Sequence, residues 1–120
     1  MFFLSVSSVN AGTAAEAKEY MQAIKAEISR GENLLKTNPS VTQIGSHSNR
    51  MKALMNEGEK FQAPSPYVSC AGLGAQAWTY WFLGMLPKFN GWDKNANADY
   101  YNLKVLYKKG LAGCQSSIKG

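Results

Sequence analysis

Residues 65–87 read SPYVSCAGLGAQAWTYWFLGMLP, a stretch that decides the fold because it is long, largely apolar and free of charge. Ser65 is a favourable N-cap, and Pro66 suits the first helical position, where its missing N–H costs nothing. Pro87 is expected to end the element, because proline interrupts the hydrogen bonds of a helix. We therefore predict a helix over about 65–86.

The uncharged run at 67–86 has about the length that a membrane-spanning helix needs. Its polar residues, among them Ser69, Gln76 and Thr79, keep its mean hydropathy at about 0.9, which is low for a spanning segment. Its glycines and alanines instead allow neighbouring helices to approach closely. We predict a helix buried on most of its sides at the centre of a bundle, and no membrane span.

Two helices are predicted before the central one, because two segments open with a capping box. Thr13 with Glu16, and Ser40 with Gln43, have the spacing in which side chain and backbone cap each other. The apolar residues that follow recur at helical spacing: Ala17, Tyr20, Met21, Ile24 and Ile28 in the first segment, and Ile44, Met51, Leu54 and Met55 in the second.

Glycines are expected to interrupt these flanking helices. Gly31 predicts a stop or a kink in the first, and the residue before Pro39 predicts its end. Gly45 and the polar residues after it predict that the regular part of the second helix begins only near Asn49.

The last helix is predicted from apolar residues that recur three and four positions apart. These residues are Tyr100, Leu103, Tyr107, Leu111 and Cys114. Asn97 or Asp99 is expected to cap the helix, and Gly110 and Gly113 are expected to fray it.

The length and composition fit one domain. The chain has 120 residues, of which 45% are hydrophobic and 18% charged, as in a globular protein. We predict an all-α fold, a small antiparallel bundle of about four helices around the apolar helix at 65–86. Residues 12–120 are expected to form this single helical domain.

Residues 1–11 form a short apolar segment that ends in small residues. Val9 and Ala11 occupy the −3 and −1 positions of a signal-peptidase site, although the usual positive region is missing. We interpret the segment as the remnant of a secretory signal, which predicts a periplasmic or secreted protein. The alternative is an N-terminal arm packed on the domain.

The two cysteines are predicted to form a disulfide. Cys70 lies near the start of the third predicted helix and Cys114 near the end of the fourth, so an antiparallel arrangement places them at one end of the bundle. An exported chain favours the bond; two reduced, buried thiols are the alternative. A nucleophilic Cys70 with His47 as its base is a further alternative, but His47 lies in a polar segment and is expected at the surface or as a helix cap.

Metal and cofactor sites are not predicted. Four residues alternate as in a calcium-binding loop: Asp93, Asn95, Asn97 and Asp99. The pattern fails where Ala98 replaces the turn glycine and Lys104 replaces the bidentate glutamate. Haem is disfavoured because the chain has no C-x-x-C-H motif and one histidine.

The positive charge indicates an acidic partner. The net charge is +5, with 13 basic and 8 acidic residues. Most of the excess lies after residue 87. Because an exported protein seldom meets nucleic acid, we predict no nucleic-acid binding and favour an acidic protein partner or an anionic surface.

The partner-binding surface is predicted at the connection between the last two helices. Residues 88–99 form a loop that is long for a helical bundle and rich in turn residues. Trp92 is the main candidate, since tryptophan is enriched at interface hot spots; the alternative is that it covers the bundle end. The predicted interface comprises Lys88, Phe89, Trp92, Asp93, Lys94 and Tyr100.

These observations predict an exported, non-enzymatic protein-binding protein. The leading interpretation is an inhibitor or immunity-type protein that neutralises a toxin or a cell-wall hydrolase. The first alternative is a carrier that holds a small ligand or cofactor in the bundle core, and the second is a cysteine-dependent enzyme that uses Cys70 and His47.

Overall fold

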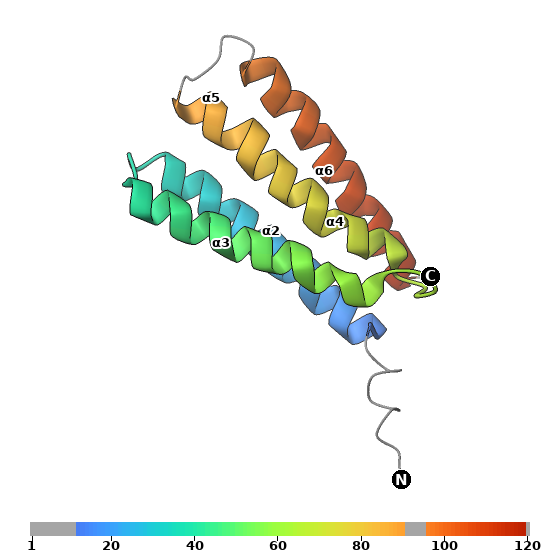
Figure 1. Cartoon of the computed structure of the whole chain (residues 1–120). Coiled ribbons are helices and arrows are strands. Elements are labelled where there is room, and N and C mark those ends of the chain that lie inside the picture. Colours follow the sequence, from blue (N-terminus) through green and yellow to red (C-terminus); the bar gives the residue numbers. More distant parts are fainter. Residues whose placement is uncertain (1–11, 91–95, 120) are drawn as a thin grey trace.

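The computed structural model describes residues 12–90 and 96–119, and every regular element in that part of the chain is helical. The elements are α2 (Ala14–Leu35), α3 (Val41–Glu57), η1 (Gly58–Phe61), α4 (Val68–Thr79), η2 (Tyr80–Met85), α5 (Leu86–Asn90) and α6 (Ala96–Lys119). Two antiparallel pairs result, α2 with α3 and the α4–α5 helix with α6 (Figure 1). The predicted antiparallel bundle is confirmed for the described residues.

Both predicted capping boxes are present at the starts of α2 and α3. The Thr13 and Ser40 hydroxyls accept hydrogen bonds from the backbone N–H groups of Glu16 and Gln43. The Glu16 and Gln43 side chains accept in return from the backbone N–H groups of the capping residues. Helix α3 therefore begins at Val41, and the predicted delay to Asn49 is wrong, because the cap stabilises the first turn despite Gly45.

Gly31 does not stop the first helix, since α2 continues to Leu35. Its role is close packing. A Cβ atom at position 31 would lie 2.6 Å from the Nε2 atom of His47 and 2.8 Å from the ring of Trp81. The glycine lets α2 approach α3 and η2 at this point, and no other residue fits there without a shift.

The central helix begins later than predicted. It starts at Val68, and Ser65 is not its N-cap. The Ser65 hydroxyl instead accepts a hydrogen bond of 3.0 Å from the backbone N–H of Tyr67, in the turn before the helix. This local bond uses the hydroxyl that the prediction assigned to capping.

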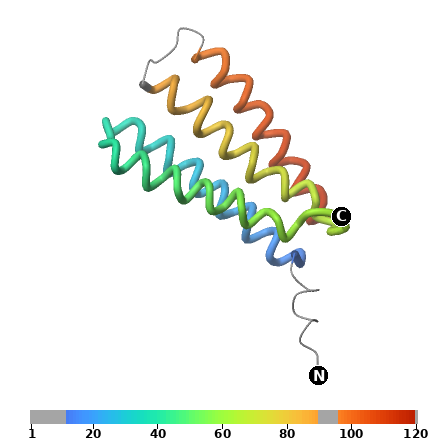
Figure 2. Tube along the Cα trace, in the orientation of Figure 1, coloured from blue at the N-terminus to red at the C-terminus, as the bar shows by residue number. Residues whose placement is uncertain are grey.

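The central helix also continues past Pro87, which was expected to end it. Elements α4, η2 and α5 form one continuous helix from Val68 to Asn90, visible as an unbroken coil in Figure 2. Segment η2 is π-helical, and the Leu86 N–H bonds to the Trp81 carbonyl five residues back. The wider turn just before Pro87 accommodates its ring, which clashes with the preceding carbonyls in a regular α-helix.

The core surrounds the α4–α5 helix, which packs against α6, α3 and α2. Its fully buried side chains include Trp81, Phe61, Leu73 and Met85. Trp81 is therefore in the core, whereas Trp78 on the same helix is half-buried and stacks on Phe82, with ring centroids 5.2 Å apart. Among the described residues, no helix combines the length and the apolarity that a membrane crossing requires.

Helix α6 is longer at both ends than predicted. It begins at Ala96, so Asn97 and Asp99 lie inside the helix, and the predicted loop at 88–99 is helical at both of its ends. It continues through its glycines to Lys119 without fraying. Gly110 instead gives space to Gln76, whose side-chain amide a Cβ atom at position 110 would overlap.

Candidate protein-binding surface

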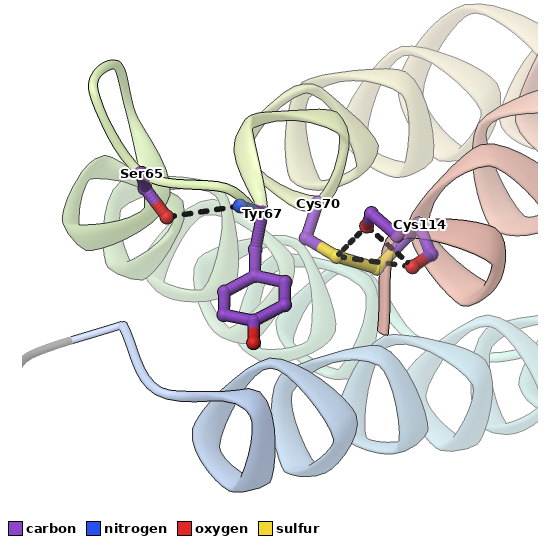
Figure 3. Close-up of a disulfide and its surroundings, with 5 residues drawn as sticks. Ser65, Tyr67, Cys70 and Cys114 are labelled. Atoms are coloured by element: carbon purple, nitrogen blue, oxygen red, sulfur yellow. Dashed lines mark hydrogen bonds between the residues drawn. A yellow bond between two sulfur atoms is a disulfide. The ribbon is translucent and has the colours of Figure 1, made fainter. Parts of the chain in front are cut away.

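Cys70 and Cys114 form a disulfide between the start of α4 and the end of α6, with their Cα atoms 4.5 Å apart. Figure 3 shows the bond beside the turn that contains Ser65 and Tyr67. Both cysteines are fully buried. The disulfide fixes the two helices to each other at one end, and the bonded Cys70 has no thiolate to act as a nucleophile.

His47 is fully buried, so the prediction that it lies at the surface is wrong. It precedes the buried Met51 by one helical turn on α3 and therefore shares its inward face. Its Nδ1 atom lies 3.4 Å from a carboxylate oxygen of Glu27, and its ring packs edge-on against Trp81 with centroids 4.4 Å apart. No contact joins His47 to the cysteine pair, because the histidine faces α2 and η2.

The ionisation of His47 is governed by this burial. Loss of hydration lowers its pKa below the usual value; the nearby Glu27 carboxylate opposes this, and Arg50 and Arg30 reinforce it. The Nε2 atom, which faces Gly31, has no hydrogen-bond partner among residues 12–90 and 96–119. The group is therefore kept neutral inside the bundle.

Three residues of the predicted interface lie together at the far end of the α4–α6 hairpin. The Lys88 ammonium is 4.6 Å from the centroid of the Tyr100 ring, and it donates a hydrogen bond of 2.9 Å to the side chain of Asn97. Phe89 meets Tyr100 edge-on at 6.2 Å. The contacts hold Lys88 in one place against aromatic surface.

The aromatic side chains around Lys88 differ in their exposure to solvent. Tyr100 is only 5% exposed, so it supports the surface rather than projecting from it, whereas its neighbour Tyr101 is 53% exposed. The remaining predicted interface residues, Trp92, Asp93 and Lys94, lie outside the described part of the chain. Their role stays a prediction.

An exposed apolar surface follows the same hairpin, and sequence patterns did not reveal it. Phe82 and Leu83 on η2 are 48% and 53% exposed, and Leu106 on α6 is 50% exposed. Together with half-buried Trp78, stacked on Phe82, they leave large apolar side chains in contact with solvent. Large apolar side chains exposed close together mark interaction sites in soluble proteins, and Trp78 and Phe82 form such a pair.

A groove of about 190 Å³ lies between α4 and α6, and Leu106 is both one of its lining residues and one of these exposed apolar residues. Ala75 and Thr79 form its α4 side, and Leu103 and Leu106 form its α6 side, with Gln76 also lining it. We call these five residues the α4–α6 groove. Its volume is below the roughly 300–1,000 Å³ of small-molecule pockets, so it suits single side chains of a larger partner.

The charges on this hairpin are almost all positive. Between Val68 and Lys119, the described residues contain one acid, Asp99, near the end of the hairpin away from the disulfide. They contain five lysines: Lys88, Lys104, Lys108, Lys109 and Lys119. The six glutamates of the chain lie on the α2–α3 half, where they are interspersed with basic residues.

Within residues 12–90 and 96–119, no three His, Cys, Asp or Glu side chains gather closely enough to hold a metal ion. Comparison with family models, curated proteins and solved structures gives no match to this chain. The function is therefore inferred from the surfaces described above.

Proposed function

We propose that this chain is an exported, non-enzymatic protein that binds another protein through its α4–α6 hairpin and neutralises it. The partner class is a toxin or a cell-wall hydrolase, which makes the chain an inhibitor or an immunity-type protein. The observation that carries the proposal is the exposed apolar surface of Phe82, Leu83 and Leu106 on a hairpin whose charges are nearly all lysines.

The burial pattern supports binding at the surface over the two alternatives. A carrier needs space inside the bundle, but Trp81, Phe61 and Met85 are fully buried and occupy the centre. An enzyme based on Cys70 needs a free thiolate, which its bond to Cys114 removes. That bond also suits an oxidising compartment, in agreement with the signal-like segment at 1–11.

The lysines supply the electrostatic part of the recognition. An apolar centre with a charged rim is the usual anatomy of a protein interface, and the rim charge selects a partner of opposite sign. The partner surface is therefore acidic around an apolar patch. Lys88, held over the Tyr100 ring, extends the positive charge to the end of the hairpin where Trp92 and Lys94 occur in the sequence.

Capture by chemical cross-linking in envelope extracts tests this proposal. The wild-type chain is compared with Phe82→Asp on the apolar surface and with Val41→Asp, which places the same charge at an 87% exposed valine on α3. We expect one envelope or secreted protein to be retained by the wild type and by Val41→Asp but lost from Phe82→Asp. The purified chain should then inhibit the activity of that protein in proportion to its occupancy.

Two results would contradict the proposal. The first is that all three chains retain the same proteins, since the surface would then have no part in binding. The second is that the captured protein keeps its full activity when it is saturated with the chain. Far-UV circular dichroism and thermal melting of each variant verify that the fold is intact before capture.

A further inference from the structure

The α4–α6 groove has the form of a hole that accepts a side chain from a third helix. Ala75 and Thr79 are one turn apart on α4, and Leu103 and Leu106 are one turn apart on α6. Side chains from two adjacent helices thus line a shallow groove, and such grooves accept the apolar face of an amphipathic helix. The hole is open to solvent and is about the size that large aliphatic side chains fill.

The exposed face of α4 continues from this hole towards the disulfide. Gly72 is exposed, and a Cβ atom built there meets nothing within 4 Å. Val68, one turn before it, is 50% exposed. The face thus offers a line of small or apolar positions along one helix, and a straight partner helix follows such a line better than a loop does.

The lysines near the groove indicate which charges a partner helix carries. Lys109 follows Leu106 by three positions on α6, so it neighbours this groove residue on the helix surface, and it lies in the same hollow as Val105. Lys108 and Lys104 lie further round the same helix, beside Val105. A second copy of this chain would place an equal set of lysines against these, which is unfavourable. Glutamate or aspartate on the flanks of the partner helix is favourable.

We infer that the α4–α6 groove binds an amphipathic helix of the partner protein, with an apolar row in the groove and acidic residues on its flanks. The inference rests on the proposed function, since it names the part of the partner that the hairpin recognises. The apolar row displaces water from Leu103 and Leu106, and the acidic flanks pair with Lys109 and its neighbours.

Two synthetic helical peptides are the probes. They share one row of leucines at helical spacing and differ only in the flanking residues, which are glutamates in one peptide and lysines in the other. Fluorescence anisotropy measures their binding to the full chain. We expect the glutamate peptide to bind at least about tenfold more tightly than the lysine peptide, and added salt to reduce this difference.

Adjacent residues of α6 provide a matched pair of variants. Leu106 lines the groove and is 50% exposed, whereas Val105 is 52% exposed on the outer face of α6 and lines no part of the groove. Leu106→Asp should weaken binding of the glutamate peptide by about tenfold or more. Val105→Asp should weaken it clearly less, because it lowers the positive charge of α6 by the same amount but leaves the groove itself intact.

The inference would be overturned if the two peptides bind equally tightly or if neither binds. It would also be overturned if Leu106→Asp and Val105→Asp weaken binding of the glutamate peptide equally. If sedimentation shows a dimer that Leu106→Asp dissociates, a second copy occupies the groove. If vesicles containing phosphatidylglycerol bind the chain through Leu106 and the peptides do not, the occupant is a membrane surface. If capture of the partner protein requires Leu106 but neither peptide binds, the proposed function stands, and the inference that the groove binds a helix is wrong.

Discussion

His47 is the buried titratable group whose protonation state bears most directly on stability. Its pKa is lowered in the folded chain, mainly by loss of hydration, whereas in the unfolded chain it returns to its ordinary value of about 6.5. Above that value the histidine is neutral in both states and the fold has its full stability. As the pH falls below it, the unfolded chain takes up a proton that the folded chain resists, and the free energy of unfolding decreases.

We expect chemical denaturation to show this loss between about pH 7 and pH 5, where histidine is the side chain that titrates. Glutamine cannot be protonated in this range. The free energy of unfolding of His47→Gln should therefore change much less with pH, whether the variant is more or less stable than the parent. A variant that loses stability with pH as steeply as the parent would show that the buried imidazole is not responsible.

Gly31 allows a second test at the scale of one residue. Gly31→Ala should destabilise the fold by about 1–3 kcal/mol, the usual cost of overpacking a tight site, because its Cβ atom would lie 2.6 Å from His47. Gly45→Ala is the matched control: a Cβ atom there meets nothing. In that exposed turn of α3, alanine should stabilise by about 0.5–1 kcal/mol. Equal effects of both substitutions on urea unfolding would argue against close packing at Gly31.

Trp81 and Trp78 lie on the same helix but should contribute unequally. Trp81 is fully buried, and its Nε1–H donates a hydrogen bond of 2.8 Å to the Ser48 hydroxyl. Trp81→Ala should therefore cost about 3–5 kcal/mol of unfolding free energy. Trp78→Ala should cost clearly less, because that side chain is half exposed. If urea denaturation gives the reverse order, η2 is not the centre of the core.

The disulfide is expected to stabilise the α4–α6 pair mainly by restricting the unfolded chain. Cys70 and Cys114 are 44 positions apart, for which the chain-entropy model gives roughly 4 kcal/mol. Reductant should lower the melting temperature of the parent and leave that of a Cys70→Ala, Cys114→Ala variant unchanged. Two free thiols detected by mass spectrometry in protein from its native compartment would contradict the bond.

The sequence predicted which segments are helical better than where they end. Capping boxes at Thr13 and Ser40 act locally, so their chemistry alone places the starts of α2 and α3. The ends depend on packing. Gly31 and Gly110 look like helix breakers until the neighbouring side chains of His47 and Gln76 are known. Pro87 is tolerated because a π-helical turn precedes it, a feature that no periodicity indicates.

The candidate surface was only partly predictable for a related reason. The run around Phe82 and Leu83 is uncharged on every side, so its hydropathy pattern does not distinguish the buried face from the exposed one. Only the positions of α3 and α6 show that Trp81 points inward while Phe82 points outward. The excess of lysines after residue 87, by contrast, can be read directly from the sequence, and the acidic partner that it indicates stays a prediction.

At the scale of the whole molecule, Trp92 is expected to add to binding at the end of the hairpin. The described helices leave five positions, 91–95, for the connection, which is an ordinary length, so the tryptophan rather than the loop length now carries this prediction. Trp92→Ala should weaken the complex by about 2 kcal/mol or more, the hot-spot scale, with folding nearly unchanged. Unfolding of the variant, or unchanged affinity in calorimetry, would assign Trp92 to the scaffold.

Amide chemical-shift mapping of the labelled chain during titration with the captured partner tests the central claim most directly. The account predicts that the largest changes fall on α4, η2 and α6, around Thr79, Phe82 and Leu106, with small changes on the exposed face of α3 near Val41. Changes concentrated on α2 and α3, with the α4–α6 hairpin unaffected, would contradict it.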